Sequence, residues 1–304
     1  MPLSEPVRHQ LAGVPALDRE TTPPSLTAGS LPETDDLSYS DFAFDRSNDL
    51  IDRGGHAAVY RATVGPDDEH VALKRPFPNK TVDRDTVRRI TDEVTAWARL
   101  DDHPYIATVL DWETDPDPVP WIAVEYLDGG HVTRLSDSIT VEQRLWTAYA
   151  MADAVAYASG QQGVTHHDLK PANILLQQMP GDTWAVPKII DWELSRELIQ
   201  HDGSINQSTP KYAAPEQNPC IMPGVEVGVH TDVYQLGVVC YEVLTDTYPS
   251  HLGGSVSPPS DINPDLPAVI DEILLRALSH EREQRYEHPI QFRDALADIF
   301  QRLS

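Results

Sequence analysis

The feature that most constrains the fold is a segment at residues 232–244 that is apolar almost all the way round a helical wheel. A helix without a polar face has to be buried on every side, so other helices must surround it. Three segments with caps or helical periodicity can do so, at residues 140–160, 267–278 and 289–303. The sequence therefore predicts a mainly α-helical lobe in its second half.

The stretch before these helices has a different pattern, with short β-branched and aromatic runs bounded by turn residues. Strands are expected at Leu50–Ile51, Val59–Ala62, Val71–Lys74, Tyr105–Trp112 and Trp121–Tyr126, and one helix at about 83–100. We therefore expect an α+β chain with two lobes. The first is small and mainly antiparallel β with one key helix, and the second is larger and mainly α.

The first 45 residues are rich in Pro, Ser, Thr and acidic residues and show no sustained periodicity. Such a segment cannot bury much apolar surface and is expected to be disordered. The predicted organisation is a tail at 1–45, a first lobe at 46–126 and a second lobe at 127–304.

The charge balance excludes some partners. The chain has 48 acidic and 23 basic residues and a formal net charge of -25. This field repels phosphate backbones and anionic lipid, so we expect neither a nucleic-acid nor a membrane partner. The acidic excess runs along the whole chain and favours adaptation to the molar salt of a halophilic prokaryote, against the alternative of a moderately acidic mesophilic protein.

Three further absences point to the cytoplasm. The two cysteines, Cys220 and Cys240, do not form a disulfide framework, and the first residues lack a basic end and an apolar run. No apolar run approaches the ~20 residues that cross a bilayer. We therefore expect a soluble, cytoplasmic protein.

Short motifs whose side chains could take part in catalysis or binding follow one another in a fixed order through both predicted lobes. They are Ile51–Ala62, Val71–Lys74, Glu93, Val124–Leu127, His167–Asn173, Asp191–Glu193 and Ala214–Glu216. Each motif is weak alone, but their order is specific. With this set the chain resembles a eukaryotic-type (Hanks-type) serine/threonine protein kinase domain, from about Asp49 to Leu303. The resemblance implies a bilobal protein-kinase-like fold.

The resemblance also implies a site for ATP between the lobes. Lys74 would reach the α- and β-phosphates, and Glu93 would hold the Lys74 ammonium in place. The adenine slot and the glycine-rich loop would use Ile51, Gly54, Gly55, Val59, Ala72 and Leu175, with Val124 as gatekeeper and the backbone of Glu125 and Leu127 as the hinge.

The catalytic roles follow from the same resemblance. Asp168 would accept or orient the proton of the substrate hydroxyl, and Lys170 would lie against the transferred phosphate. Asn173 and Asp191 are oxygen donors suited to Mg²⁺, with Mn²⁺ as an alternative. Ser208 and Thr209 would belong to the activation and substrate loop, and the segment around them favours protein Ser/Thr hydroxyls as substrates.

Three other residues would have structural roles. Glu216 would pair with Arg285, and Asp232 would hold the backbone of the catalytic loop.

Some residues depart from the family pattern. Asp52 and Ala57 stand in place of two glycines of the phosphate loop, which predicts weaker ATP binding. His167 replaces an arginine, so activation-loop phosphorylation should not be required. Glu193 replaces a glycine, which should restrict movement of Asp191.

These departures leave alternatives to an active Ser/Thr protein kinase. One is a pseudokinase that acts as a nucleotide-binding regulatory scaffold, and the other is a small-molecule phosphotransferase.

Overall fold

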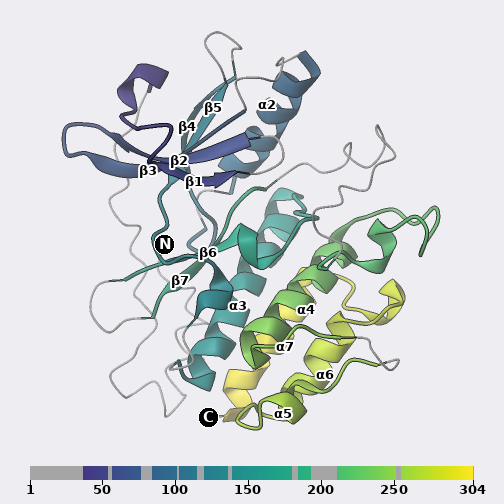
Figure 1. Cartoon of the computed structure of the whole chain (residues 1–304). Coiled ribbons are helices and arrows are strands. Elements are labelled where there is room, and N and C mark those ends of the chain that lie inside the picture. Colours follow the sequence, from purple (N-terminus) through teal and green to yellow (C-terminus); the bar gives the residue numbers. More distant parts are fainter. Residues whose placement is uncertain are drawn as a thin grey trace.

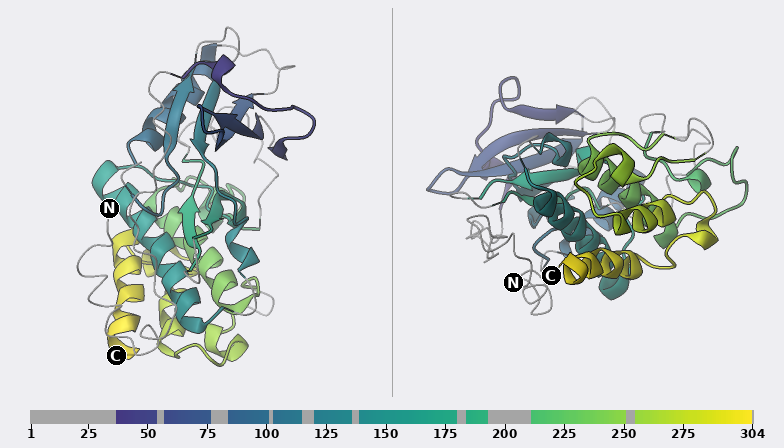
Figure 2. Two further views of the ribbon diagram at one scale, coloured as in Figure 1. Left: turned by 90° about the vertical axis from the view of Figure 1, so that its left-hand side faces the viewer. Right: turned by 90° about the horizontal axis from the view of Figure 1, so that it is seen from below.

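The computed structural model describes residues 37–53, 57–76, 84–100, 103–114, 120–135, 139–179, 184–192, 211–250 and 255–303. Two lobes are stacked one above the other, a sheet-containing lobe and a helical lobe (Figures 1 and 2). The predicted α+β bilobal fold is confirmed. Because residues 1–36 lie outside the described part, the predicted disorder of that segment stays a prediction.

The first lobe is built on a five-stranded antiparallel sheet with the strand order β1-β2-β3-β5-β4. The strands are β1 (Leu50–Arg53), β2 (Ala57–Val64), β3 (Glu69–Pro76), β4 (Val109–Glu113) and β5 (Trp121–Glu125). Along β3, Val71, Leu73 and Arg75 are buried on one face of the sheet, and Ala72 and Lys74 alternate with them on the other. The strands β2 and β3 pair antiparallel and form a hairpin with its turn at residues 65–68.

The single long helix of this lobe, α2 (Arg84–Ala98), covers the face of the sheet that carries Ala72. Its Val94 and Trp97 are buried in the same cluster as Ile122 and Val124 of β5. The Trp97 indole donates a hydrogen bond to the Ala107 carbonyl at 2.7 Å, which ties the end of the helix to the chain leading into β4. The helix expected at 83–100 is therefore confirmed.

The strand expected at 105–112 begins later than predicted, at Val109. The apolar residues before it connect the two lobes instead, because Tyr105 and Ala107 exchange backbone hydrogen bonds with Ile189 (2.9 and 3.0 Å). An apolar run buried in this way resembles a strand in sequence.

The second lobe packs around α4 (Val229–Thr245), which is buried along nearly its whole length, as predicted. Its neighbours are α3 (Val141–Tyr157), α6 (Val269–Ala277) and α7 (Pro289–Leu303), with the short α5 (Pro259–Ile262) at one end. The Thr140 hydroxyl accepts the Gln143 N–H at 3.2 Å, so the predicted cap of α3 is confirmed. The remaining helical turns are η3 (Val132–Arg134), η4 (Ala158–Gln162), η5 (Pro171–Asn173), η6 (Pro215–Gln217) and η7 (Arg282–Gln284).

A two-stranded sheet of β6 (Ile174–Gln177) and β7 (Val186–Ile189) lies in the second lobe, where it faces the first (Figure 1). The chain segments on either side of these strands carry the catalytic-loop motif and Asp191. This small sheet therefore positions both motifs at the junction of the lobes.

The buried apolar residues form two separate clusters. The larger cluster includes α2, the inner face of the first-lobe sheet and the helical lobe. The smaller cluster lies on the outer face of that sheet and contains Phe42, Val71, Leu73 and Trp121 among its members.

Residues 37–45, which the sequence analysis assigned to the disordered tail, pack on that outer face. They contain a turn of 3-10 helix, η2 (Tyr39–Asp41), and the buried Phe42. The tail prediction is therefore wrong for this part, because the three aromatic residues between 39 and 44 have apolar surface to bury.

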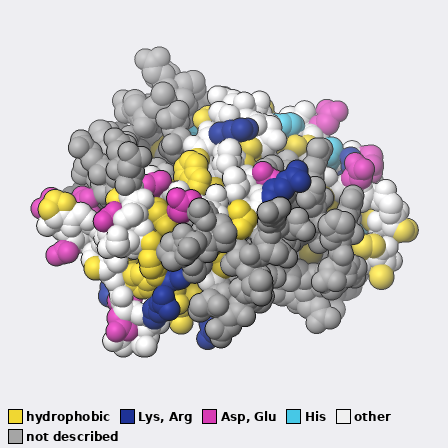
Figure 3. All heavy atoms as spheres, turned by 90° about the horizontal axis from the view of Figure 1, so that it is seen from above, with side chains coloured by type: hydrophobic (Ala, Val, Ile, Leu, Met, Phe, Trp, Pro, Cys, Tyr) yellow, Lys and Arg dark blue, Asp and Glu magenta, His cyan; other side chains and the backbone are white. Residues whose placement is uncertain are grey.

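The surface of the first lobe carries charges of both signs. Seen from above, acidic and basic side chains are interspersed on the described part of this face (Figure 3). No helix in the described part of the chain is both long and apolar enough to cross a membrane.

Candidate active site

Lys74 is the centre of a charged cluster between the lobes. Its ammonium lies 3.0 Å from Glu93 Oε1 on α2 and 3.0 Å from Asp191 Oδ1 just after β7. Three segments far apart in sequence therefore meet at one atom. The structure brings together the three residues to which the sequence analysis gave phosphate, positioning and metal roles.

Asp168 lies in the loop before β6 with its polar partners close by. Its carboxylate accepts a hydrogen bond from the Lys170 ammonium at 2.6 Å and is 3.3 Å from Asn173 Nδ2. The Asn173 amide also donates to the Asp168 carbonyl at 2.9 Å. The Asp168 side chain is 44% exposed, so a substrate hydroxyl could approach it from solvent.

The backbone of the catalytic loop is held by the buried helix α4. Asp232 is fully buried and accepts the N–H groups of His166 (2.8 Å) and His167 (2.7 Å). Two charge-assisted hydrogen bonds to one carboxylate fix the peptide planes immediately before Asp168. The contact expected of Asp232 is present.

Two glutamines that the sequence analysis missed complete this support. Gln235 accepts the Leu169 N–H at 3.0 Å and donates to the His167 carbonyl at 3.1 Å, and Gln217 donates to the same carbonyl at 2.7 Å. His167 has a positive φ of 61°, a conformation that needs such support in a residue with a Cβ. An amide within an otherwise apolar helix was a sequence signal for Gln235.

The two neighbours of Asp191 in the chain, Ile190 and Trp192, hold its segment in place. Its neighbour Trp192 is fully buried and packs on the His166 ring with 5.0 Å between centroids. The His166 Nε2 is 2.9 Å from the Ile190 carbonyl, and the Ile190 N–H donates to the Asn173 carbonyl at 3.0 Å. These bonds connect the segment of Asp191 to the catalytic loop.

Asp191 and Asn173 fit a hard cation. The structure places them on two adjacent segments joined by the Ile190–Asn173 bond. Because the side-chain nitrogen of Asn173 donates to the Asp168 carbonyl, the side-chain oxygen Oδ1 of Asn173 is directed away from that carbonyl. A carboxylate and an amide oxygen are ligands that Mg²⁺ accepts while keeping waters and phosphate oxygens for its other positions.

The residues of the predicted adenine slot lie on the first-lobe sheet, except for Leu175, which lies on β6 of the second lobe. Val59, Ala72 and Leu175 are partly buried, Val124 is buried, and Ile51 at the edge is exposed. The hinge continues β5 through the buried Leu127, and the Glu125 N–H is bonded to the Thr108 carbonyl at 3.0 Å.

Sequence reasoning missed the side-chain role of Glu125. Its carboxylate accepts two hydrogen bonds from Lys188 of β7, at 2.6 and 2.9 Å, and one from the Thr108 N–H at 2.7 Å. The pair is buried, with 5% of the Glu125 and 11% of the Lys188 side chain exposed. It joins the hinge strand to the second lobe.

Glu216 and Arg285 form the predicted ion pair. The two carboxylate oxygens accept from Nη1 and Nη2 at 2.8 and 3.0 Å, and Thr231 donates to Glu216 at 2.8 Å. Burial would raise the pKa of Glu216, but the hydrogen bonds and charge of Arg285 outweigh it and hold that pKa below its usual value. The pair fixes the Ala214–Glu216 segment against η7.

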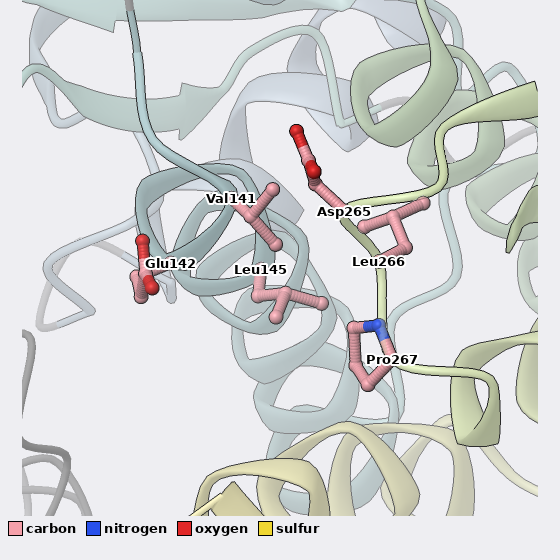
Figure 4. A pocket seen from close by; sticks show the side chains of 6 residues that line it. All are labelled: Val141, Glu142, Leu145, Asp265, Leu266 and Pro267. Carbon is pink, nitrogen blue, oxygen red and sulfur yellow. The ribbon is translucent and has the colours of Figure 1, made fainter.

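Four of the predicted site residues, Gly54, Gly55, Ser208 and Thr209, lie outside the described part of the chain, as does Glu193. A pocket between the start of α3 and the loop before α6 is lined by Val141, Glu142, Leu145, Asp265, Leu266 and Pro267 (Figure 4). None of the predicted site residues lines this pocket.

The fold and the site together define a class. A β lobe lies over an α lobe, and at their junction Lys74 pairs with Glu93 and Asp191. The loop that carries Asp168, Lys170 and Asn173 is hydrogen-bonded to the segment before Asp191. Such an arrangement suits the binding of a nucleotide phosphate. Residues 46–301 match the family described as protein kinase domain. The chain belongs to the protein kinase domain family, as the sequence resemblance predicted.

The named relatives agree with this assignment. The chain is 29% identical to the serine/threonine-protein kinase Pkn1 of Myxococcus xanthus, over 81% of this chain and 37% of that protein. It is 32% identical to the DNA damage-responsive serine/threonine-protein kinase RqkA of Deinococcus radiodurans, over 78% of this chain and 36% of that protein. The chain thus spans little more than a third of these relatives.

A solved structure gives the same fold. The PknI kinase domain of Mycobacterium tuberculosis superposes with a TM-score of 0.61 at 28% identity, covering 86% of this chain and 97% of that one.

Proposed function

We propose that this chain is an ATP-dependent protein kinase that transfers the γ-phosphoryl group of ATP to Ser or Thr hydroxyls of proteins. The observation that carries the proposal is the Lys74 ammonium, placed 3.0 Å from both Glu93 and Asp191. Phosphoryl transfer depends mainly on positioning and on cations that offset phosphate charge, and this cluster supplies both.

The residues divide the work as follows. Lys74 binds the α- and β-phosphates, and Glu93 keeps its ammonium aligned. Asp168 takes the proton of the attacking hydroxyl as the oxygen–phosphorus bond forms and the bond to the β-phosphate oxygen breaks, which releases ADP. Lys170, already 2.6 Å from Asp168, offsets charge on the transferred group.

Asp191 and Asn173 would hold the divalent cation, Mg²⁺ or alternatively Mn²⁺. When bound, such a cation neutralises charge on the phosphate oxygens. The short Lys170–Asp168 and Lys74–Asp191 contacts support this proposal, because each pairs one of the two carboxylates with a cation.

The proposal extends to the substrates, the cellular location and the source of the enzyme. We propose protein substrates rather than nucleic acid or membranes, a cytoplasmic location, and a halophilic source. The net charge of -25 supports the last, because salt screens the repulsion that so many carboxylates produce.

The test is transfer of labelled γ-phosphate by the full chain to itself and to a generic protein. It is followed with Mg²⁺, with Mn²⁺ and with a chelator, across a KCl series up to several molar. Asp168→Asn should lower the rate roughly 10²- to 10⁴-fold, as expected for loss of a general base. Lys74→Ala should also lose transfer, whereas the exposed Arg61→Ala on β2 should keep it.

Each alternative predicts its own result. Nucleotide binding without transfer at any salt concentration would identify a pseudokinase scaffold, to which Asp52, His167 and Glu193 point. Phosphorylation of small alcohols but not of proteins would identify a small-molecule phosphotransferase.

A further inference from the structure

The segment Leu37–Phe44, which we call the N-terminal strap, crosses the outer face of the first-lobe sheet. The Leu37 N–H bonds to Asp111 of β4 at 2.8 Å, and the Phe42 ring lies edge-on to Trp121 of β5 with 4.9 Å between centroids. At its other end, Ala43 exchanges two backbone hydrogen bonds with Thr63 of β2, each 2.9 Å. Figure 1 shows this segment, in purple, beside the sheet.

The central contact of the strap is with β3. Arg75 donates a hydrogen bond to the Tyr39 hydroxyl, and its guanidinium lies 4.7 Å from the centre of the Tyr39 ring. Tyr39 in turn packs edge-on against Phe44, which packs on Tyr60 of β2. Only 4% of Arg75 is exposed, and the hydroxyl and ring of Tyr39 are partners for this buried cation.

Arg75 is the residue next to Lys74, and successive side chains of a strand point to opposite faces. The strap therefore contacts the outer face of β3 one residue from Lys74, whose ammonium must reach Glu93 and Asp191. Val71 and Leu73, on the same face as Arg75, share the smaller apolar cluster with Phe42. Across the sheet, β3 presents Ala72 to the adenine slot.

We propose that the N-terminal strap is a positioning element for Lys74, acting through the Tyr39–Arg75 contact and the seating of Phe42. It holds β3 so that the Lys74 ammonium stays aligned with its two carboxylates before nucleotide arrives. A side chain held in place loses less freedom on binding, so the strap raises nucleotide affinity without touching the nucleotide. This inference rests on the proposed use of Lys74 for the phosphates of ATP.

The test is a double-mutant cycle on ATP affinity, measured by calorimetry with the full chain in an Asp168→Asn background that does not turn over. Tyr39→Ala should weaken ATP binding roughly three- to tenfold, with the upper limit set by the free energy of the cation–π contact and the hydrogen bond that align Lys74. In a Lys74→Ala background the same change should have little further effect, because coupled residues are not additive. Tyr39→Phe, which keeps the ring, should recover part of the loss.

Ser40→Ala is the matched control, because Ser40 is on the strap but exposed, and its hydroxyl bonds to Ser38. It should leave ATP affinity unchanged. Equal loss with and without Lys74, or no loss in Tyr39→Ala while circular dichroism shows a folded chain, would overturn the proposal. If this coupling is found while the chain with Asp168 intact transfers no phosphate, the kinase activity alone is refuted.

Discussion

The Glu216–Arg285 ion pair gives the sharpest prediction of stability. Glu216→Gln keeps the shape of the side chain but removes its charge, and the two partners are 1% and 0% exposed. Breaking a buried pair from one side costs about 3–5 kcal/mol. Arg285 keeps hydrogen bonds to the carbonyls of His230, Ser279 and His280, which places the expected loss near the lower end, about 3 kcal/mol.

The assay is unfolding in urea at several pH values, with a thermal scan beside it. At roughly 2–4 °C per kcal/mol for a domain of this size, Tm should fall by about 6–12 °C at neutral pH. Because the folded-state pKa of Glu216 is lowered, its contribution is complete above the usual glutamate pKa of about 4.3 and is lost as the pH falls through the lowered value. The difference between the two proteins should therefore shrink below about pH 4.

The control is Glu283→Gln, which removes an exposed partner of Arg282 and should cost less than about 1 kcal/mol. A loss for Glu216→Gln no larger than that of this control, or one that is the same at pH 7 and in acid, would refute the reasoning.

Three further predictions concern other parts of the chain. In urea unfolding, Lys188→Met should cost about 3 kcal/mol of stability because it leaves the buried Glu125 carboxylate without its cation. The double variant with Glu125→Leu should recover most of this loss, and a double variant as unstable as the single one would contradict the prediction. Gly129→Ala should lower stability by about 1–3 kcal/mol in a thermal scan, because the added Cβ would lie 2.5 Å from the Leu176 carbonyl oxygen, while Gly228→Ala, whose methyl meets open space, should show no steric penalty. A thiol reagent should modify the exposed Cys220 in the native protein and Cys240 only after unfolding, since burial raises the pKa of the Cys240 thiol; rapid native labelling of both would disprove it.

The parts of the fold that the sequence predicts are those where local pattern and burial agree. The apolar segment at 232–244 becomes the buried centre of a lobe, because no other environment suits such a helix. The charged residues of the site were assigned through the order of their motifs, and the structure brings Lys74, Glu93 and Asp191 together.

The contacts that the sequence did not predict are those between distant segments of weak local pattern. The strap was assigned to the tail because Pro- and Ser-rich sequence precedes it, although Tyr39, Phe42 and Phe44 follow 38 residues without an aromatic side chain. The Glu125–Lys188 pair joins residues 63 positions apart, and the sequence around either residue does not indicate which residue it contacts. Such pairings depend on tertiary packing.

The two separate apolar clusters have a consequence for how the molecule loses its structure. The larger one runs from α2 through the inner face of the sheet into the helical lobe, so we expect the two lobes to unfold together. The smaller one, under the strap, depends on a few aromatic contacts and can open by itself, as local regions with less buried area do. Amide hydrogen exchange at Ala43 and Thr63 should then be faster than in α4. The chain would pass through a state in which the strap has been released while the rest of the domain remains folded.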